Sequence, residues 1–384
     1  MQVAFYAPLK PVDHPVPSGD RLIARMLCDA LQTAGMNVDV AARLRSRVAD
    51  GNAFRQARLA EVGTKLAARL LRQYQSGFRS KPEVWFTYHL YYKAPDWIGP
   101  VVADALDIPY VVAEASFAPK RANGLWAQSH LAVKTALQQA DAVFSLNRAD
   151  MACLEQVCPS SRLHFLQPFT RVDDWTVTER PEINRDCIRL VTTAMMRDGD
   201  KLKSYEVLAK ALGKLVGEGI DNWHLTVIGD GPARQAVEQL FQDSGIGERA
   251  VSFMGLTTPQ QTRDILGKSD LFVWPAINEA FGMALLEAQA SGLPVLAGDA
   301  GGVSGIVSGG VTGWLVPVGD VDAFADRLSR CINDDAPVLR TIGHAGASKA
   351  KQLHTVEAAA DLLSATITQV VSNYENQQDG LSSA

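Results

Sequence analysis

The chain has 384 residues, of which 47% are apolar and 21% are charged. One hydrophobic core seldom grows this large, so we expect two globular domains of roughly 150 to 200 residues each. The formal net charge of -5 argues against nucleic acid as a partner, because a nucleic-acid groove normally needs an excess of basic residues.

Five cysteines are scattered along the chain, at positions 28, 153, 158, 187 and 331. They form no CxxC pair and have no histidine at metal-ligand spacing, which is typical of reduced core thiols. The opening MQVAFYAPL lacks the basic leader and apolar run of a secretory signal, and no later stretch approaches 18 uninterrupted apolar residues. We therefore expect a cytoplasmic protein, and peripheral contact with the inner face of a membrane stays open.

Strand and helix signals alternate from the start of the chain. A short apolar run at 3–8, an amphipathic helix at 18–35 that ends in a glycine, and a second apolar run form a strand-helix-strand unit. Further buried strands are predicted in the sequences EVWFTYHL, IPYVVAEA and DAVFSLN. The first loop contains only Gly19, so the GxGxxG fingerprint of a dehydrogenase is absent.

The alternation restarts near residue 188. Strands are predicted in the sequences IRLVTTAMM, WHLTVIGDG, VSFMG, LFVWP and PVLAGD, with a helix after the first, the second and the fourth of them. This order predicts an α/β protein with two doubly wound parallel sheets, whose strand ends would face a central crevice. The polar segment 170–186 is the predicted linker. It separates an amino-terminal domain (1–175) from a carboxyl-terminal domain (176–360), and 361–384 form a last helix and tail that could pack back on the first domain.

Two glutamates, Glu279 and Glu287, flank a predicted helix start in the sequence EAFGMALLEAQASG. The first backbone amides of this helix are those of Phe281, Gly282, Met283 and Ala284. Such amides have no partner inside a helix and attract anions. The two carboxylates suit hydroxyl groups, whose protons they accept. The spacing alone leaves an alternative open. Glu279 could simply interact favourably with the dipole at the helix start, and Glu287 could lie on the solvated face of the helix.

The segment from Glu279 to Leu328 resembles the carboxyl-terminal signature of family 4 glycosyltransferases, which are retaining enzymes of the GT-B fold. The shared pattern is a glutamate, a Phe-Gly step, a second glutamate, the sequence SGLPVLA, a glycine-rich turn, GWLVP and an acidic step before a helix. The resemblance implies that Glu279 contacts the donor sugar and Glu287 the nucleotide ribose. It also implies that the Phe-Gly amides hold the diphosphate.

The same resemblance implies an arginine and a lysine after the first strand of this domain. Arg197 matches the arginine, and both Lys201 and Lys203 remain candidates for the lysine. An Asp-x-Asp sequence at 198–200 could hold a divalent metal. We nevertheless expect no metal and no other cofactor, because these cations can neutralise the phosphates themselves.

Three glycines of this domain also match family positions near the nucleotide. Gly229 and Gly231 stand in the turn VIGDGP and are expected to leave room for the nucleotide, while Gly255 is expected beside the base.

The resemblance is weaker in the first half of the chain. The Ser-Gly-Asp turn at 18–20, with Gly19, resembles the loop that approaches the donor phosphates, and His89 lies on a matching strand. Where many members carry a histidine after the next strand, this chain offers only Glu114 and Ser116 as polar candidates. We predict that Glu114 is a site residue, and His89 is either a site residue or a core histidine.

The sequence therefore predicts a metal-independent hexosyltransferase that takes a nucleotide-diphosphate sugar, UDP- or GDP-linked, as donor. The acceptor would be a glycan, a lipid-linked or a small molecule bound by the first domain, as in polysaccharide biosynthesis. Two alternatives remain: a nucleotide-sugar epimerase or phosphorylase of the same fold, and a non-catalytic nucleotide-sugar-binding subunit.

Residues 41–93 contain eleven lysines and arginines against three acidic residues. Many of these cations fall in a predicted helix. The excess indicates either a solvated outer face or a surface that recruits an anionic membrane or an acidic glycan.

Overall fold

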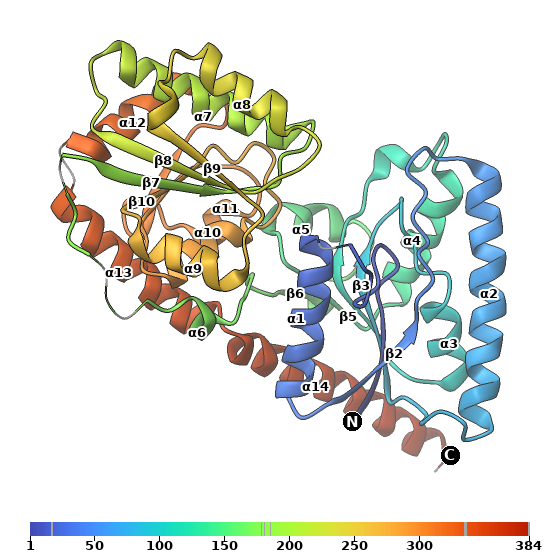
Figure 1. The fold of residues 1–384 in the computed structure, drawn as a ribbon. Coiled ribbons are helices and arrows are strands. Elements are labelled where there is room, and N and C mark those ends of the chain that lie inside the picture. Colours follow the sequence, from blue (N-terminus) through green and yellow to red (C-terminus); the bar gives the residue numbers. More distant parts are fainter. Residues whose placement is uncertain (17, 178, 180, 185, 334–335, 383–384) are drawn as a thin grey trace. The chain divides into compact units, whose positions relative to one another are not determined.

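The computed structural model describes the whole chain except residues 17, 178, 180, 185, 334–335 and 383–384 (Figure 1). It divides into two compact units, which we call the N-unit (Met1–Gln167 with Val356–Ala384) and the C-unit (Pro168–Thr355). The first change of unit precedes the expected boundary at 175/176, because Val172 already belongs to the C-unit core. Three residues of the expected linker, 178, 180 and 185, lie outside the described residues.

The N-unit contains a six-stranded parallel sheet with the strand order β2-β1-β3-β4-β5-β6. Its strands are β1 (Gln2–Tyr6), β2 (Asn37–Ala42), β3 (Val84–Leu90), β4 (Tyr110–Ala115), β5 (Ala142–Ser145) and β6 (Leu163–Phe165). Strands such as β4, YVVAEA, are buried over their whole length because helices cover both faces of a parallel sheet. The strand order reverses between β1 and β3, so the loops after these two strands flank the point where ligands of such sheets bind.

The N-unit helices are α1 (Gly19–Thr33), α2 (Ala53–Gln75), α3 (Gly99–Leu106), α4 (Ala127–Gln139), α5 (Arg148–Leu154) and α14 (Val356–Ser382). The last helix, α14, packs along α1 (Figure 1). Its Leu363 and Ile367 are fully buried, and the Tyr374 hydroxyl donates to Asp141 Oδ2 at 3.1 Å. The end of the chain therefore completes the unit in which the chain begins.

The C-unit contains a second six-stranded parallel sheet, with the order β12-β11-β10-β7-β8-β9. Its strands are β7 (Ile188–Thr193), β8 (Trp223–Ile228), β9 (Val251–Gly255), β10 (Leu271–Trp274), β11 (Val295–Gly298) and β12 (Gly313–Val316). Its helices are α6 (Val172–Trp175), α7 (Asp200–Gly217), α8 (Arg234–Asp243), α9 (Pro259–Lys268), α10 (Met283–Ala290), α11 (Val303–Ile306), α12 (Val321–Asn333) and α13 (Ala336–Leu353). The order reverses between β7 and β10, so the loops after these strands flank the corresponding ligand-binding position.

The predicted architecture of two doubly wound parallel sheets is confirmed. The structure adds β6, β12 and α9, which the sequence patterns did not single out. It also corrects the start of α10: the helix begins at Met283, and Gly282, with a φ of 75°, is its left-handed cap. Phe281 therefore precedes the helix instead of beginning it.

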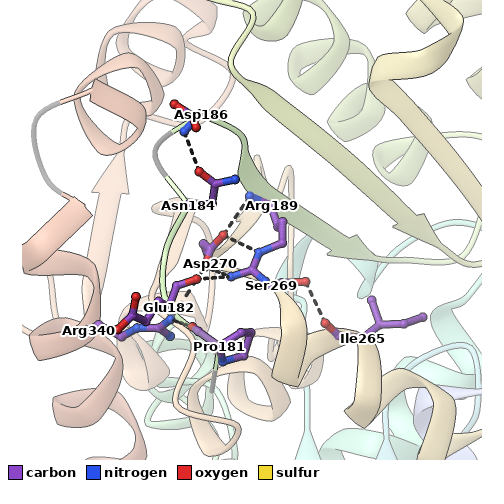
Figure 2. Close-up of polar contacts among 9 residues, drawn as sticks. All are labelled: Pro181, Glu182, Asn184, Asp186, Arg189, Ile265, Ser269, Asp270 and Arg340. Atoms are coloured by element: carbon purple, nitrogen blue, oxygen red, sulfur yellow. Dashed lines mark hydrogen bonds and ion pairs between the residues drawn. The ribbon is translucent and has the colours of Figure 1, made fainter. Parts of the chain in front are cut away.

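A buried ion pair joins the amino ends of β7 and β10 (Figure 2). The Arg189 side chain donates through Nε and Nη2 to the two Asp270 oxygens, at 2.8 and 2.7 Å, and the Arg189 backbone amide adds a third bond at 3.0 Å. Arg340 of α13 lies 3.9 Å from Asp270 and donates to the Pro181 carbonyl. These contacts connect the end of the linker segment, the sheet and α13 at the edge opposite the strand carboxyl ends.

Candidate active site

The loops after β7 and β10 carry an ion pair between Lys201 and Glu279. Lys201 lies on the first turn of α7, and Glu279 precedes α10. Trp274, the last residue of β10, donates from Nε1 to Glu279 Oε2 at 3.3 Å, and the Lys201 ammonium lies 5.3 Å from the centroid of its ring. Lys203, by contrast, is 63% exposed and lies 3.8 Å from Asp200. Of the two candidate lysines, only Lys201 contacts Glu279.

The segment that carries Glu279 is fastened to the start of α7. The Asn278 amide donates to Asp200 Oδ2 at 2.8 Å, and the Ile277 backbone amide donates to Ser204 Oγ at 3.0 Å. Ala276 and Asn278 have φ angles of 55° and 53°, in the left-handed region that non-glycine residues rarely adopt. Sequence reasoning missed Ser204 and Asn278 as positioning residues, and the tolerance of asparagine for this conformation was the one local signal.

The turn before α10 has the geometry of an anion site. In the described part of the chain, no hydrogen-bond acceptor is recorded for the backbone amides of Phe281, Gly282, Met283 and Ala284. Gly301 and Gly302 pack against this turn, and a Cβ on them would lie 2.2 Å from the Glu279 carbonyl and 2.3 Å from the Ala280 carbonyl, respectively. These close approaches fix the turn with its amides free to bind a phosphate.

Gly229 and Gly231 are required by the protein's own backbone. A Cβ on Gly229 would lie 1.9 Å from the Ala194 carbonyl, and one on Gly231 would lie 2.1 Å from the Met196 carbonyl. The loop after β8 thus packs against the loop after β7, and the Met196 amide donates to the Asp230 carbonyl at 2.9 Å. The structure thus gives a backbone reason for these glycines, and the expected reason, room for a nucleotide, stays a prediction. The glycines fix the loop that leads to Arg197.

Arg197 follows β7 and Gly255 ends β9, at the same edge of the sheet with β8 between these two strands. The Arg197 side chain is exposed, and within the described chain it has no ion-pair partner. Gly255 ends β9 with a φ of 67°, and its carbonyl accepts from the Gly229 amide at 2.9 Å. Asp200, the second aspartate of the Asp-x-Asp sequence, is engaged by Asn278 and Lys203.

Glu287 is half-buried on the second turn of α10. Burial raises the pKa of its carboxyl to about 8. No hydrogen bond or ion pair to this side chain is recorded among the described residues. Because the Glu287 carboxyl has no recorded partner among these residues, it can bind a hydroxyl group without first breaking a hydrogen bond to the protein.

The carboxyl ends of β1 and β3 in the N-unit bring Asp20 and His89 together. His89 Nδ1 lies 3.2 Å from Asp20 Oδ1. Burial alone would raise the pKa of Asp20, but the hydrogen bond and charge of His89 outweigh it, and the pKa falls below its ordinary value. His89 has a φ of 65° at the end of its strand. Gly19 is the first residue of α1, and Ser18 caps this helix by accepting from the Arg21 amide at 3.2 Å.

Glu114 occupies the end of the neighbouring strand β4. It is 8% exposed and has a φ of 61°. Buried polar residues with a left-handed backbone are often found at functional sites. Burial raises its pKa to about 7, the positive charge of His89 opposes the rise, and the negative charge of Asp150 adds to it. Asp150 lies in the first turn of α5 and was not predicted, because no local pattern relates it to β4.

The predicted residues thus fall into two groups. Gly19, His89 and Glu114 belong to the N-unit, at or after the ends of β1, β3 and β4. The C-unit contains Arg197, Lys201, Lys203, Gly229, Gly231, Gly255, Glu279, Phe281, Gly282, Met283, Ala284 and Glu287. Within the described residues, no group of three or more His, Cys, Asp or Glu side chains is arranged to hold a metal ion.

Residues 188–334, which contain the whole C-unit group, match the family profile of glycosyl transferases group 1. Over these residues the chain resembles this glycosyltransferase family. It is 28% identical over 242 residues to the D-inositol 3-phosphate glycosyltransferase of Mycolicibacterium smegmatis, which covers 62% of this chain and 52% of that protein. It is 33% identical over 135 residues to the N-acetyl-alpha-D-glucosaminyl L-malate synthase of Bacillus anthracis, which covers 35% of this chain and 34% of that protein. The chain thus matches about half or less of the length of these curated relatives.

Solved glycosyltransferase structures share the fold of almost the whole chain. Sucrose-phosphate synthase from Thermosynechococcus elongatus has a TM-score of 0.72 and 21% identity, covering 97% of this chain and 99% of its own. The Anabaena protein Alr3699/HepE, solved with UDP-glucose, has a TM-score of 0.68 and 17% identity, covering 96% of this chain and 100% of its own. The predicted GT-B class of two Rossmann-like domains is therefore confirmed. In the residues that the structure describes, no helix is both long and apolar enough to span a bilayer.

Proposed function

We propose that this protein is a retaining glycosyltransferase that transfers a hexosyl group from a UDP- or GDP-sugar to an acceptor bound by the N-unit. The observation that carries the proposal is the Lys201–Glu279 pair beside the unpaired amides of the turn before α10. Lys201 and the amides could bind a diphosphate, and the adjoining Glu279 carboxylate could accept hydrogen bonds from sugar hydroxyl groups. The binding of UDP and UDP-glucose by Alr3699/HepE, which has the same fold, supports a nucleotide-sugar donor.

The chemistry follows from where charge develops. When the bond between the anomeric carbon and the phosphate oxygen breaks, its electron pair stays on the diphosphate and the sugar becomes oxocarbenium-like. Arg197, Lys201 and the amides of 281–284 would stabilise that leaving group, and preorganised charge of this kind is usually the largest single catalytic effect. The acceptor oxygen bonds to the anomeric carbon on the same face, and its proton passes to the departing phosphate oxygen. No metal ion is needed for these steps, so we propose that the activity is metal-independent.

Glu279 and Glu287 would divide the donor between them. We assign Glu279 to the sugar hydroxyls, because Lys201 and Trp274 hold its carboxylate at the sheet edge. We assign Glu287 to the ribose, because its carboxyl is free of protein partners in the described chain. In the N-unit, Glu114, His89 and Asp20 are the groups suited to orient an acceptor hydroxyl, because they form one polar cluster at the ends of β1, β3 and β4.

The test is a donor screen that separates this function from its alternatives. Thermal shift with UDP, GDP and their sugars identifies the nucleotide, since a ligand at 100 times its dissociation constant adds about 2.7 kcal/mol of stability. The selected donor is then incubated with a panel of glycan, lipid-linked and small-molecule acceptors, with and without excess chelator. We expect a glycosylated product of unchanged anomeric configuration, with or without chelator. An epimerised donor or a sugar phosphate would favour the epimerase or phosphorylase, and donor binding without any product would favour a non-catalytic subunit.

We also propose that one face of α2 contacts an anionic membrane surface from a cytoplasmic location. On this face Glu61 forms an ion pair with Lys65. The other exposed members of the face are Phe54, Arg58, Arg69 and Arg72, and we call these four with Lys65 the α2 stripe. Their spacing of three, four or seven residues puts them on one side of the helix, opposite the buried Gly63, Ala67 and Leu70. Phe54 is 88% exposed, and Phe78, just beyond the end of the helix, is 78% exposed. Exposed aromatic and basic side chains together are typical of membrane-surface helices.

A further inference from the structure

A second cluster of the N-unit consists of aromatic rings with cations on them. Tyr91, Tyr92 and Lys93 follow β3, and Arg121 and Trp126 follow β4. The Tyr92 and Trp126 rings pack edge to face, with centroids 5.5 Å apart and an interplanar angle of 83°. We call Lys93, Arg121, Tyr92 and Trp126 the ring cluster. It lies in the loops at the carboxyl edge of the sheet, where ligands of doubly wound domains bind.

Two positive charges share this one pair of rings. The Arg121 guanidinium carbon lies 5.1 Å from the Tyr92 centroid and 4.9 Å from the Trp126 centroid. The Lys93 ammonium lies 5.8 Å from both centroids. Each contact is within the range of a cation–π interaction. Two cations on the same pair of rings create a local excess of positive charge, which favours the binding of an anion.

The protein supplies no such anion within the described chain. No ion pair of Lys93 or Arg121 with a carboxylate is recorded there. The Arg121 Nε atom is buried and has no hydrogen-bond partner. A buried donor without an acceptor is costly, and in a ligand site the acceptor is supplied by the ligand. The guanidinium is suited to this task, because it binds a carboxylate or a phosphate through two parallel hydrogen bonds.

The ring cluster is connected to the His89 cluster through Tyr91. The Tyr91 ring lies 5.7 Å from that of Tyr92 and 5.0 Å from that of His89. Burial raises the pKa of the Tyr91 hydroxyl, and the neighbouring Arg47 guanidinium opposes that rise, so a further cation lies beside the ring that links the two clusters. The ring cluster therefore lies close to His89 and Glu114. A bound molecule that places one hydroxyl group at these two residues could also contact the ring cluster.

We propose that the ring cluster is a subsite for an anionic substituent, a phosphate or a carboxylate, on a sugar acceptor. This inference rests on the proposed function, because it names the chemistry of the acceptor. The cations bind the anionic group, and the Tyr92 and Trp126 rings contact the apolar face of the sugar ring. A neutral sugar would keep the ring contacts and lose the charge-assisted hydrogen bonds.

The test measures binding to the full chain, with no transfer reaction required. Calorimetry compares glucose 6-phosphate, glucuronate, inorganic phosphate and glucose at one ionic strength, and the intrinsic fluorescence of the seven tryptophans, of which Trp126 is one, is followed in parallel. We expect the phosphorylated or the carboxylated sugar to bind at least tenfold more tightly than glucose, and the better of the two identifies the substituent. Arg121→Ala and Lys93→Ala should each weaken this binding about tenfold. Lys81→Ala, which removes an exposed cation of the same unit, should not change it.

Two outcomes would overturn the subsite. One is equal affinity, or no measurable affinity, for the anionic and neutral sugars. The other is unchanged affinity in Arg121→Ala with Lys93→Ala. Arg121→Lys keeps the charge and the fold but not the paired hydrogen bonds, so partial binding by this variant separates recognition from loss of structure. Binding of these probes together with failure of every transfer assay would reject the proposed function and leave the subsite in place.

Discussion

Lys201 and Glu279, which are 78 residues apart in the chain, form one ion pair at the carboxyl edge of the C-unit sheet. Their side chains are 22% and 18% exposed, so the pair is largely removed from solvent. Lys203, two residues further along α7, faces outward. The pair therefore distinguishes two lysines that the sequence alone left equivalent.

The first prediction compares these lysines. Lys201→Ala should lower kcat with the donor by about 10²- to 10³-fold, because it removes a fixed positive charge from the leaving diphosphate and leaves Glu279 unpaired. Lys203→Ala should change kcat by less than about threefold, as expected for an exposed lysine in a weak surface pair. Steady-state kinetics and melting temperatures of both variants give the measurement. A larger loss in Lys203→Ala would reverse the assignment.

The second prediction separates the two glutamates. Glu279→Ala should lower the rate of the chemical step while free nucleoside diphosphate binds almost as before, because this residue is assigned to the sugar. Glu287→Ala should weaken binding of the nucleoside diphosphate, because it is assigned to the ribose. Calorimetry with the diphosphate and single-turnover kinetics make the comparison. The reverse pattern would exchange their roles.

The third prediction concerns pH. Burial raises the pKa of Glu287 from its ordinary value of 4.5 to about 8 in the folded protein. The folded state thus holds a proton that the unfolded state has lost, and the residue's contribution to the free energy of unfolding falls as the pH rises from about 4.5 to about 8. Glu287→Gln cannot ionise, so it should raise the melting temperature at pH 8 by on the order of 2 °C or more and leave it unchanged near pH 4.5. An equal effect at both pH values would contradict the shift.

The fourth prediction concerns the pair in Figure 2. Asp270→Ala should lower the free energy of unfolding by about 3 to 5 kcal/mol, because it removes the acceptor of the Arg189 backbone amide and the carboxylate that neutralises the guanidinium, which keeps only the Glu182 carbonyl. Denaturant unfolding of the full chain measures this loss. Asp326→Ala, which removes an exposed aspartate of α12, is the control and should change little. Comparable losses in both variants would mean that the buried pair contributes nothing special.

The fifth prediction tests the α2 stripe. The protein should sediment with vesicles that contain anionic lipid, and this binding should weaken at high salt, since each basic residue near such a surface contributes about 1 kcal/mol. Arg58→Glu with Arg69→Glu should abolish sedimentation, while Arg330→Glu on the C-unit should not. If binding did not depend on lipid charge and salt, or if the double substitution did not reduce it, the α2 stripe would be only a solvated face of the protein.

The order of strands and helices was predictable because buried parallel strands are nearly continuous apolar runs. β6 escaped prediction because it has three residues, Leu163–Phe165, with His164 in the middle, which is too short to show a period. The predicted start of α10 was wrong by two residues. Glycine can adopt either a helical or a left-handed φ, and the tertiary structure, which the sequence pattern does not show, determines the left-handed φ of Gly282.

The residue types of the candidate site were predictable, and their contacts were not. A family pattern pointed to Glu279 and Arg197, but the choice of Lys201 depends on where α7 begins and which side of it faces the loop. The nearness of Asp150 to Glu114 depends on how α5 packs against β5, the strand that pairs with β4. Contacts between residues distant in the chain leave no period in the sequence, so such pairs become visible only in three dimensions.

The return of the chain to the N-unit at Val356 sets the order in which the protein can be completed during synthesis. The C-unit is whole once Thr355 has left the ribosome, whereas the N-unit still waits for the later-translated α14. Until then, the surface of α1 that receives α14 stays uncovered. The unit that is translated first is thus finished last, and a ribosome that stops after residue 355 releases a complete C-unit joined to an N-unit with an open apolar face.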